Sequence, residues 1–116
     1  DSNRNVQIVP INVGHGKVNS VCYIIDKKLA YISDVNKIYK KDFKYFKKLK
    51  YLIIDCLRDK NHPSHFNLEQ SLAMIKIFLP KKAILTNLHT DLDYDKIKKL
   101  LPTNIIPAYD GLTLNL

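Results

Sequence analysis

Histidine and aspartate residues, whose side chains bind metals or move protons, follow the apolar runs of this sequence. These residues are His15, Asp34, Asp55, His62, His65 and His89. In α/β proteins the carboxyl ends of neighbouring strands meet at one edge of the sheet, and ligands bind there. Imidazole and carboxylate groups bind zinc, iron or manganese, and one carboxylate can bridge two ions. The pattern predicts a metal or acid–base site at one sheet edge, against the alternative that each histidine is an ordinary surface residue.

The first half of the chain predicts three strands, a short helix and a fourth strand. The strands are expected over residues 6–13, 21–25, 29–32 and 51–54, with a loop at residues 14–16 and a hairpin across residues 26–28. Pro10 suits an edge strand or a bulge. The lysine-rich residues 37–50 suit a helix with a solvated face and inward aromatic side chains. The continuous apolar run of residues 51–54 suits a strand buried on both faces that stops at Asp55.

The second half alternates helices and strands. Asn67 and Gln70 have the spacing of a capping box, which opens a helix that Pro80 ends. Its apolar stripe is expected to consist of Leu68, Leu72, Ile75 and Leu79. A strand over residues 83–85, a helix capped by Asp93 and running to Leu101, and a strand pair of residues 105–106 and 112–114 complete the expectation. The whole chain reads as one α/β unit with mixed strand directions.

The composition fits one folded domain, and the apolar runs, the first residues and the cysteines indicate the compartment in which we expect it. With 116 residues, 46% of them hydrophobic, the chain can form a core without metals or disulfides. No apolar run is as long as a membrane span, and the first residues do not form a signal peptide. Cys22 and Cys56 lie in apolar runs, as reduced thiols of a cytoplasmic protein do. Only Arg4 and Arg58 are arginines among 19 basic residues, so the net charge of +8 is a weak sign of nucleic-acid binding.

Several motifs match one known family in order and spacing. Residues 15–17, 21–23 and 29–35 resemble the segment of the metallo-β-lactamase superfamily in which a ligand histidine precedes a hairpin and a metal-bridging aspartate closes it. Residues 52–58, 62–68, 85–89 and 108–112 resemble the branch that contains the cyclic-phosphate phosphodiesterase of phosphonate breakdown. The resemblance covers essentially the whole chain. It implies the C-terminal half, a β-sheet plus flanking helices, of an αββα sandwich.

The same resemblance implies a metal site. His15 becomes a metal ligand and Asp34 the carboxylate that bridges two metals. The branch usually has a histidine at the position of Asn87, so either His89 supplies the last ligand or that ligand is lost, and we favour His89. The superfamily signature H-x-H-x-D-H occurs nowhere in residues 1–116, which we therefore interpret as the later part of a longer domain.

Three further residues complete the candidate site. His65 corresponds to a histidine beside the substrate phosphate, which makes it the candidate catalytic acid and a phosphate-binding residue. His62 is a second substrate-binding candidate, although a hydrogen bond within its own loop is the favoured alternative. Asp55 either orients a ligand histidine or simply ends a strand. Cys22 stands where relatives often have glycine, and we interpret it as a packing residue.

The implied function is part of a metal-dependent hydrolase, a phosphodiesterase that uses a metal-bound hydroxide on a small phosphodiester. Two zinc or manganese ions are expected in the complete enzyme, and at most one weakly held ion in this chain, which we expect to be inactive alone. A nuclease of the tRNA-processing type, from the same superfamily, is one alternative. The other is a non-catalytic remnant with an exposed apolar sheet face that binds an N-terminal half-domain or forms a homo-oligomer.

Overall fold

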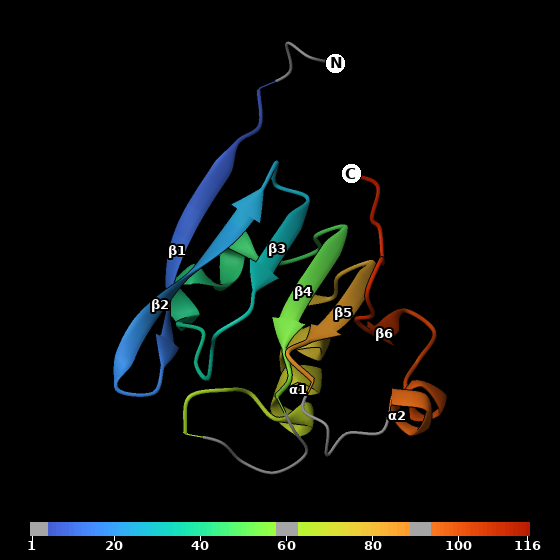
Figure 1. Cartoon of the computed structure of the whole chain (residues 1–116). Helices are drawn as coiled ribbons and strands as arrows, with labels where there is room; N and C mark the ends of the chain where they lie inside the picture. The colour runs from blue at the N-terminus through green and yellow to red at the C-terminus, as the bar shows by residue number, and fades with distance from the viewer. Residues whose placement is uncertain (1–4, 58–62, 89–93) are drawn as a thin grey trace.

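The fold is a mixed β-sheet with helices packed against it (Figure 1). The computed structural model describes residues 5–57, 63–88 and 94–116, so His62, His89 and Asp93 lie outside the described residues. In these ranges the sheet has the order β1-β2-β3-β4-β5-β6. The strands are β1 Ile8–His15, β2 Val18–Ile25, β3 Leu29–Ile32, β4 Tyr51–Asp55, β5 Lys82–Thr86 and β6 Ile105–Pro107. The expected α/β class with mixed strand directions is confirmed.

The first three strands are antiparallel and the last four are parallel. Asp26 and Lys27 turn the chain between β2 and β3 with φ angles of 52° and 56°, which confirms the expected hairpin. Pro10 lies in β1, an edge strand, where a missing backbone N–H is tolerated. The expected loop at residues 14–16 is wrong, because β1 continues through His15 in register with Val18 and only then turns at Gly16.

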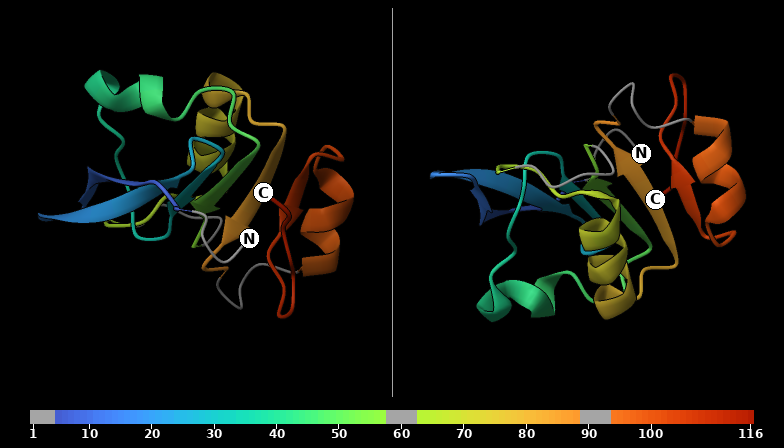
Figure 2. Two further views of the ribbon diagram at one scale, coloured as in Figure 1. Left: turned by 90° about the horizontal axis from the view of Figure 1, so that it is seen from above. Right: turned by 90° about the horizontal axis from the view of Figure 1, so that it is seen from below.

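The helix α1, Leu68–Phe78, and the 3₁₀ helix η1, Lys40–Tyr45, lie on the same side of the sheet (Figure 2). The expected capping box is present, with the side chain of Asn67 accepting from the Gln70 backbone and the Gln70 side chain accepting from the Asn67 backbone. Leu79 does not belong to the buried stripe. It follows the last turn in a left-handed conformation and is 63% exposed, while Phe78 is fully buried.

The lysine-rich segment forms less helix than expected. Only the short η1 is helical, and Lys48 then adopts a left-handed φ of 57° that ends any helical path. The inward packing of its aromatic side chains is confirmed, since Phe46 is fully buried and stacks on Phe78 with ring centroids 5.3 Å apart. This cluster holds η1 and α1 together over the sheet.

Three other expectations need correction. Asp55 belongs to β4 itself, and this strand is not buried on both faces, because Ile53 is only half-buried. The strand pair of residues 105–106 and 112–114 is wrong, because β6 pairs with β5 in parallel. The following segment instead runs to Leu116, whose carbonyl oxygen accepts hydrogen bonds from Lys28 and Lys50.

The second helix, α2, Tyr94–Leu100, packs beside β6 at the edge of the sheet (Figure 1). It stops one residue short of the expected end at Leu101. Over the described residues, the chain has no helix long and apolar enough to cross a membrane.

Candidate metal centre

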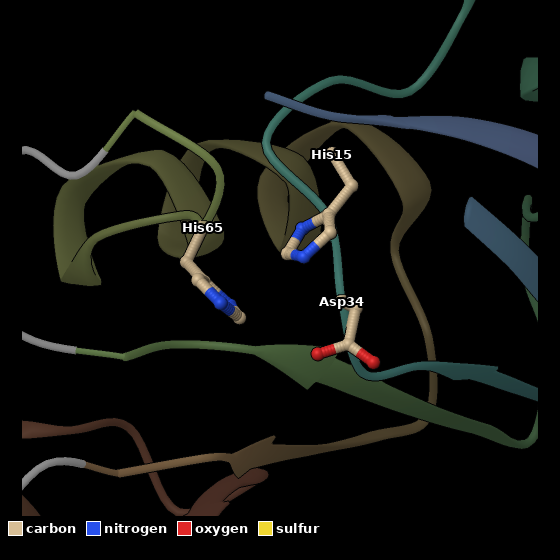
Figure 3. A group of neighbouring side chains, drawn as sticks. All are labelled: His15, Asp34 and His65. Atoms are coloured by element: carbon tan, nitrogen blue, oxygen red, sulfur yellow. The ribbon is translucent and has the colours of Figure 1, made fainter. Parts of the chain in front are cut away.

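Side chains from three distant segments meet at one edge of the sheet (Figure 3). His15 ends β1, Asp34 stands two residues beyond β3, and His65 lies just before α1. Strands β1, β3, β4 and β5 all point the same way, because β1 and β3 are each antiparallel to β2 and the later strands are parallel to β3. Their carboxyl ends therefore form one edge, where each of the three residues offers a ligand atom within 4.8 Å of the others.

The orientation of His15 is set by the loop before α1. Its Nδ1 lies 2.6 Å from the carbonyl oxygen of Ser64, and a carbonyl can only accept, so Nδ1 carries the proton. Nε2 is then the acceptor nitrogen that can bind a cation. The loop comes this close because Gly16 has no side chain: a Cβ there would lie 3.1 Å from the Cβ of Ser64.

His65 is held by a buried carboxylate. Its Nδ1 lies 2.5 Å from Oδ2 of Asp55, which is fully buried at the end of β4. The backbone N–H of Val35 donates to the same oxygen at 3.0 Å. Burial raises the pKa of the Asp55 carboxyl, while these two contacts and the Asn87 amide act in the opposite direction. Asp55 thus fixes which nitrogen of His65 points away from the strand end.

The two imidazole rings pack edge to face, with centroids 4.8 Å apart and an interplanar angle of 85°. His15 and His65 are half-buried, whereas the Asp34 carboxylate is exposed. Within the described part of the chain, the Asp34 carboxylate accepts one hydrogen bond, from the hydroxyl of Ser33 at 3.5 Å. The carboxylate is therefore open to a cation that the imidazoles also reach.

Asn87 has a role that the sequence did not reveal. Its amide nitrogen donates to the carbonyl oxygen of Ser33 and lies 3.4 Å from Oδ1 of Asp55, so it ties β5 to β3 and β4 at this edge. It adopts a left-handed φ of 60°, which asparagine tolerates better than most residues. An asparagine directly after a strand was the available signal. No sequence signal marked Ser64, because its backbone carbonyl oxygen, and not its side chain, contacts His15.

The donors fit a divalent transition metal. Two imidazoles and a carboxylate suit zinc, manganese or iron, and hydrogen bonds to backbone or carboxylate at the far ring nitrogen are usual for metal-binding histidines. Three donors from this part of the chain leave room for ligands from elsewhere, since zinc takes four and manganese six.

Solved structures with the same arrangement of strands and helices include several hydrolases. A diphosphatase from the PhnP family has a TM-score of 0.92 and 29% identity, over 96% of this chain and 44% of that chain. The metallo-β-lactamase fold protein YhfI from Bacillus subtilis has a TM-score of 0.74 and 17% identity, over 92% of this chain and 48% of that chain. Zinc-bound PqqB from Methylobacterium extorquens has a TM-score of 0.72 and 15% identity, over 96% and 50% of the two chains.

The chain therefore spans about half the length of these structures. No protein-family model matches its sequence, and no curated protein matches it significantly. The topology and these likenesses show that the chain has the fold of the C-terminal half of a metallo-β-lactamase fold, and the similar structures include a diphosphatase and a novel metallo hydrolase from Ignicoccus hospitalis.

Proposed function

We propose that this chain forms the C-terminal half of a metal-dependent phosphodiesterase. The observation that carries the proposal is the convergence of His15, Asp34 and His65 at one sheet edge. The likeness to a PhnP-family diphosphatase supports a phosphorus-centred reaction, since phosphodiesters and diphosphates are both broken by attack of water at phosphorus.

His15 and Asp34 are the proposed metal ligands, and His89, outside the described residues, is the proposed third. A divalent ion bound there supplies Lewis acidity toward a phosphoryl oxygen and lowers the pKa of water. Nε2 of His15 is the donor nitrogen, because Nδ1 is engaged by Ser64. The exposed carboxylate of Asp34 can offer one oxygen to each of two ions, zinc or manganese, in the complete enzyme.

His65 is the proposed catalytic acid. The Asp55 carboxylate accepts the Nδ1 proton at 2.5 Å and so holds the ring in one orientation, in which the imidazolium form carries its second N–H on Nε2. The remaining N–H, on Nε2, can bind a phosphate oxygen or give its proton to the leaving oxygen. The ring centroids of His15 and His65 lie 4.8 Å apart, which supports a role for His65 beside the proposed metal ligand. His62 stays a proposed substrate-binding residue.

The test is hydrolysis of bis(4-nitrophenyl) phosphate and of a cyclic phosphodiester with Mn²⁺ or Zn²⁺. The chain alone is expected to show no turnover above buffer, because the proposed ligands His15, Asp34 and His89 do not complete two ion sites. Joined to a complementary N-terminal half, the chain is expected to turn over. His65→Gln should then lower kcat by about 10²- to 10⁴-fold with a smaller change in KM.

Metal-dependent turnover by the chain alone, abolished in His15→Ala, would show that this half suffices. A complete domain that hydrolyses neither substrate would remove the phosphodiesterase proposal. The nuclease alternative makes a separate prediction, RNA binding that weakens steeply with added salt. The proposed function predicts no such binding, since only Arg4 and Arg58 among the 19 basic residues are arginines.

A further inference from the structure

A hollow lies on the face of the sheet that η1 covers, away from the candidate metal centre. Its volume is about 250 Å³, and the residues that line it come from β1, β2, the turn after β2 and the segment around η1. Val9 in this lining and His15 are six residues apart along β1, which corresponds to about 20 Å, so the two sites are separate. The complete lining consists of Val9, Ile24, Lys27, Lys44, Tyr45, Lys47 and Leu49.

The buried part of this lining is apolar. Ile24 and Leu49 are only 3% and 5% exposed. Val9, which is opposite Ile24 in the β1–β2 ladder, is half-buried. Tyr45 is 43% exposed and adds an aromatic ring to the wall. The apolar part of a ligand that enters the hollow would therefore leave water and contact apolar side chains, which favours binding.

Three lysines bring positive charge to the mouth of the hollow. Lys27, Lys44 and Lys47 are exposed, and the Lys44 ammonium lies 5.2 Å from the centroid of the Tyr45 ring. Among the described residues, no carboxylate pairs with any of these three ammonium groups. Asp42, the acidic residue in the first turn of η1, does not line the hollow. The lysines repel one another, and an anion bound at the mouth would reduce that repulsion.

The walls of the hollow are held by backbone hydrogen bonds. The turn after β2 is tied to the residue before β1, because the Asp26 N–H donates to the Gln7 carbonyl at 2.8 Å and the Gln7 N–H donates to the Asp26 carboxylate at 2.9 Å. The segment after η1 is tied to α1, because the Lys48 N–H donates to the Phe78 carbonyl at 2.8 Å. Walls fixed in this way lower the ordering cost of binding.

We propose that this hollow binds a small aromatic carboxylate, whose ring lies against the apolar lining and whose charged group meets the lysines. The volume is slightly below the roughly 300–1,000 Å³ of typical ligand sites, which suits a molecule of one or two rings. A peptide or a nucleic acid is too large to be buried in it. The inference depends on neither the metal nor the proposed hydrolysis, since the lining shares no residue with the candidate metal centre.

The experiment titrates the ¹⁵N-labelled chain with 2-naphthoate and follows the backbone amide shifts by ¹H–¹⁵N NMR. The matched probe is 2-naphthalenemethanol, which has the same rings and no charge. The test variant is Lys44→Gln/Lys47→Gln. The matched control is Lys76→Gln/Lys81→Gln, because Lys76 and Lys81 are also exposed lysines but do not line the hollow. The spectrum of each variant without probe establishes that it folds.

The expected result is saturable shifts at Lys27 and at residues 44–49. The Kd for 2-naphthoate should rise about fivefold in the test variant and less than about twofold in the control, and the uncharged probe should bind about fivefold more weakly than 2-naphthoate. Equal Kd values for the two variants, or for the two probes, would overturn the proposal. So would the absence of saturable shifts, or shifts confined to the other face of the sheet around Tyr31 or to the candidate metal centre.

Discussion

At the scale of single residues, the Asp55 carboxylate is unusual because it is fully buried and still bears on the site through His65. Its burial at the end of β4 is costly for the charged form and raises its pKa. The backbone N–H of Val35 and the Asn87 amide partly compensate. Asp55 therefore orients His65 at a desolvation cost to its own charged form.

The pH dependence of stability tests this description of Asp55. Its pKa is raised above the ordinary 3.8, so the folded chain keeps a proton that the unfolded chain releases. That contribution to stability is complete below 3.8 and is lost as the pH rises through the folded-state pKa. The variant Asp55→Asn carries no titrating group at this position, so its stability does not fall with rising pH for this reason. Urea unfolding at a series of pH values should show the wild type losing stability relative to Asp55→Asn as the pH rises; a relative gain would contradict the account.

Cys22 gives a second prediction at this scale. Burial, with a smaller contribution from Asp42, raises the pKa of its thiol to about 12, and the side chain is 1% exposed in β2. Ellman's reagent at pH 8 should therefore react with Cys22 only after unfolding. The control is Val21→Cys, since Val21 is the adjacent residue of β2 and is 44% exposed. Native Cys22 reacting as fast as that control would show that the thiol is not a packing residue.

At the scale of elements, three phenylalanines join η1 and α1 on the covered face of the sheet. The ring of Phe78 stacks on Phe46 and meets Phe43 edge to face at 5.1 Å. Phe78 is fully buried, so Phe78→Ala should cost about 3–5 kcal/mol of unfolding free energy in urea. The neighbouring Ile77 is 44% exposed, and Ile77→Ala should cost less than about 1 kcal/mol. Equal costs for the two variants would show that this cluster does not anchor the helices.

Elements with strong local signals could be predicted from the sequence, and those decided by distant contacts could not. The capping box at Asn67 and the hairpin turn at Asp26 depend on neighbouring residues alone, and both are present. In contrast, residues 112–116 form no strand pair with residues 105–106, and Leu116 instead accepts hydrogen bonds from Lys28 and Lys50, far away in the sequence. The exposure of Leu79 is a separate, local effect, because Leu79 itself adopts the left-handed conformation that ends α1.

For the molecule as a whole, the chain spans about half the length of the structures it resembles, and its candidate site lies at the sheet edge. The sequence pointed to His15, Asp34 and His65 because each follows an apolar run, and the structure brings their ligand atoms together. It could not indicate the backbone contact of Ser64 or the amide contacts of Asn87, because both depend on how strands distant in sequence align.

We propose that His15 and Asp34 bind a divalent metal, and calorimetric titration of the chain with Mn²⁺ and Zn²⁺ measures this binding directly. The account predicts one weakly bound ion per chain, lost in Asp34→Asn and retained in Asp110→Asn, since Asp110 is an exposed aspartate that does not belong to the cluster. No binding at all, or binding that Asp34→Asn leaves unchanged, would contradict it.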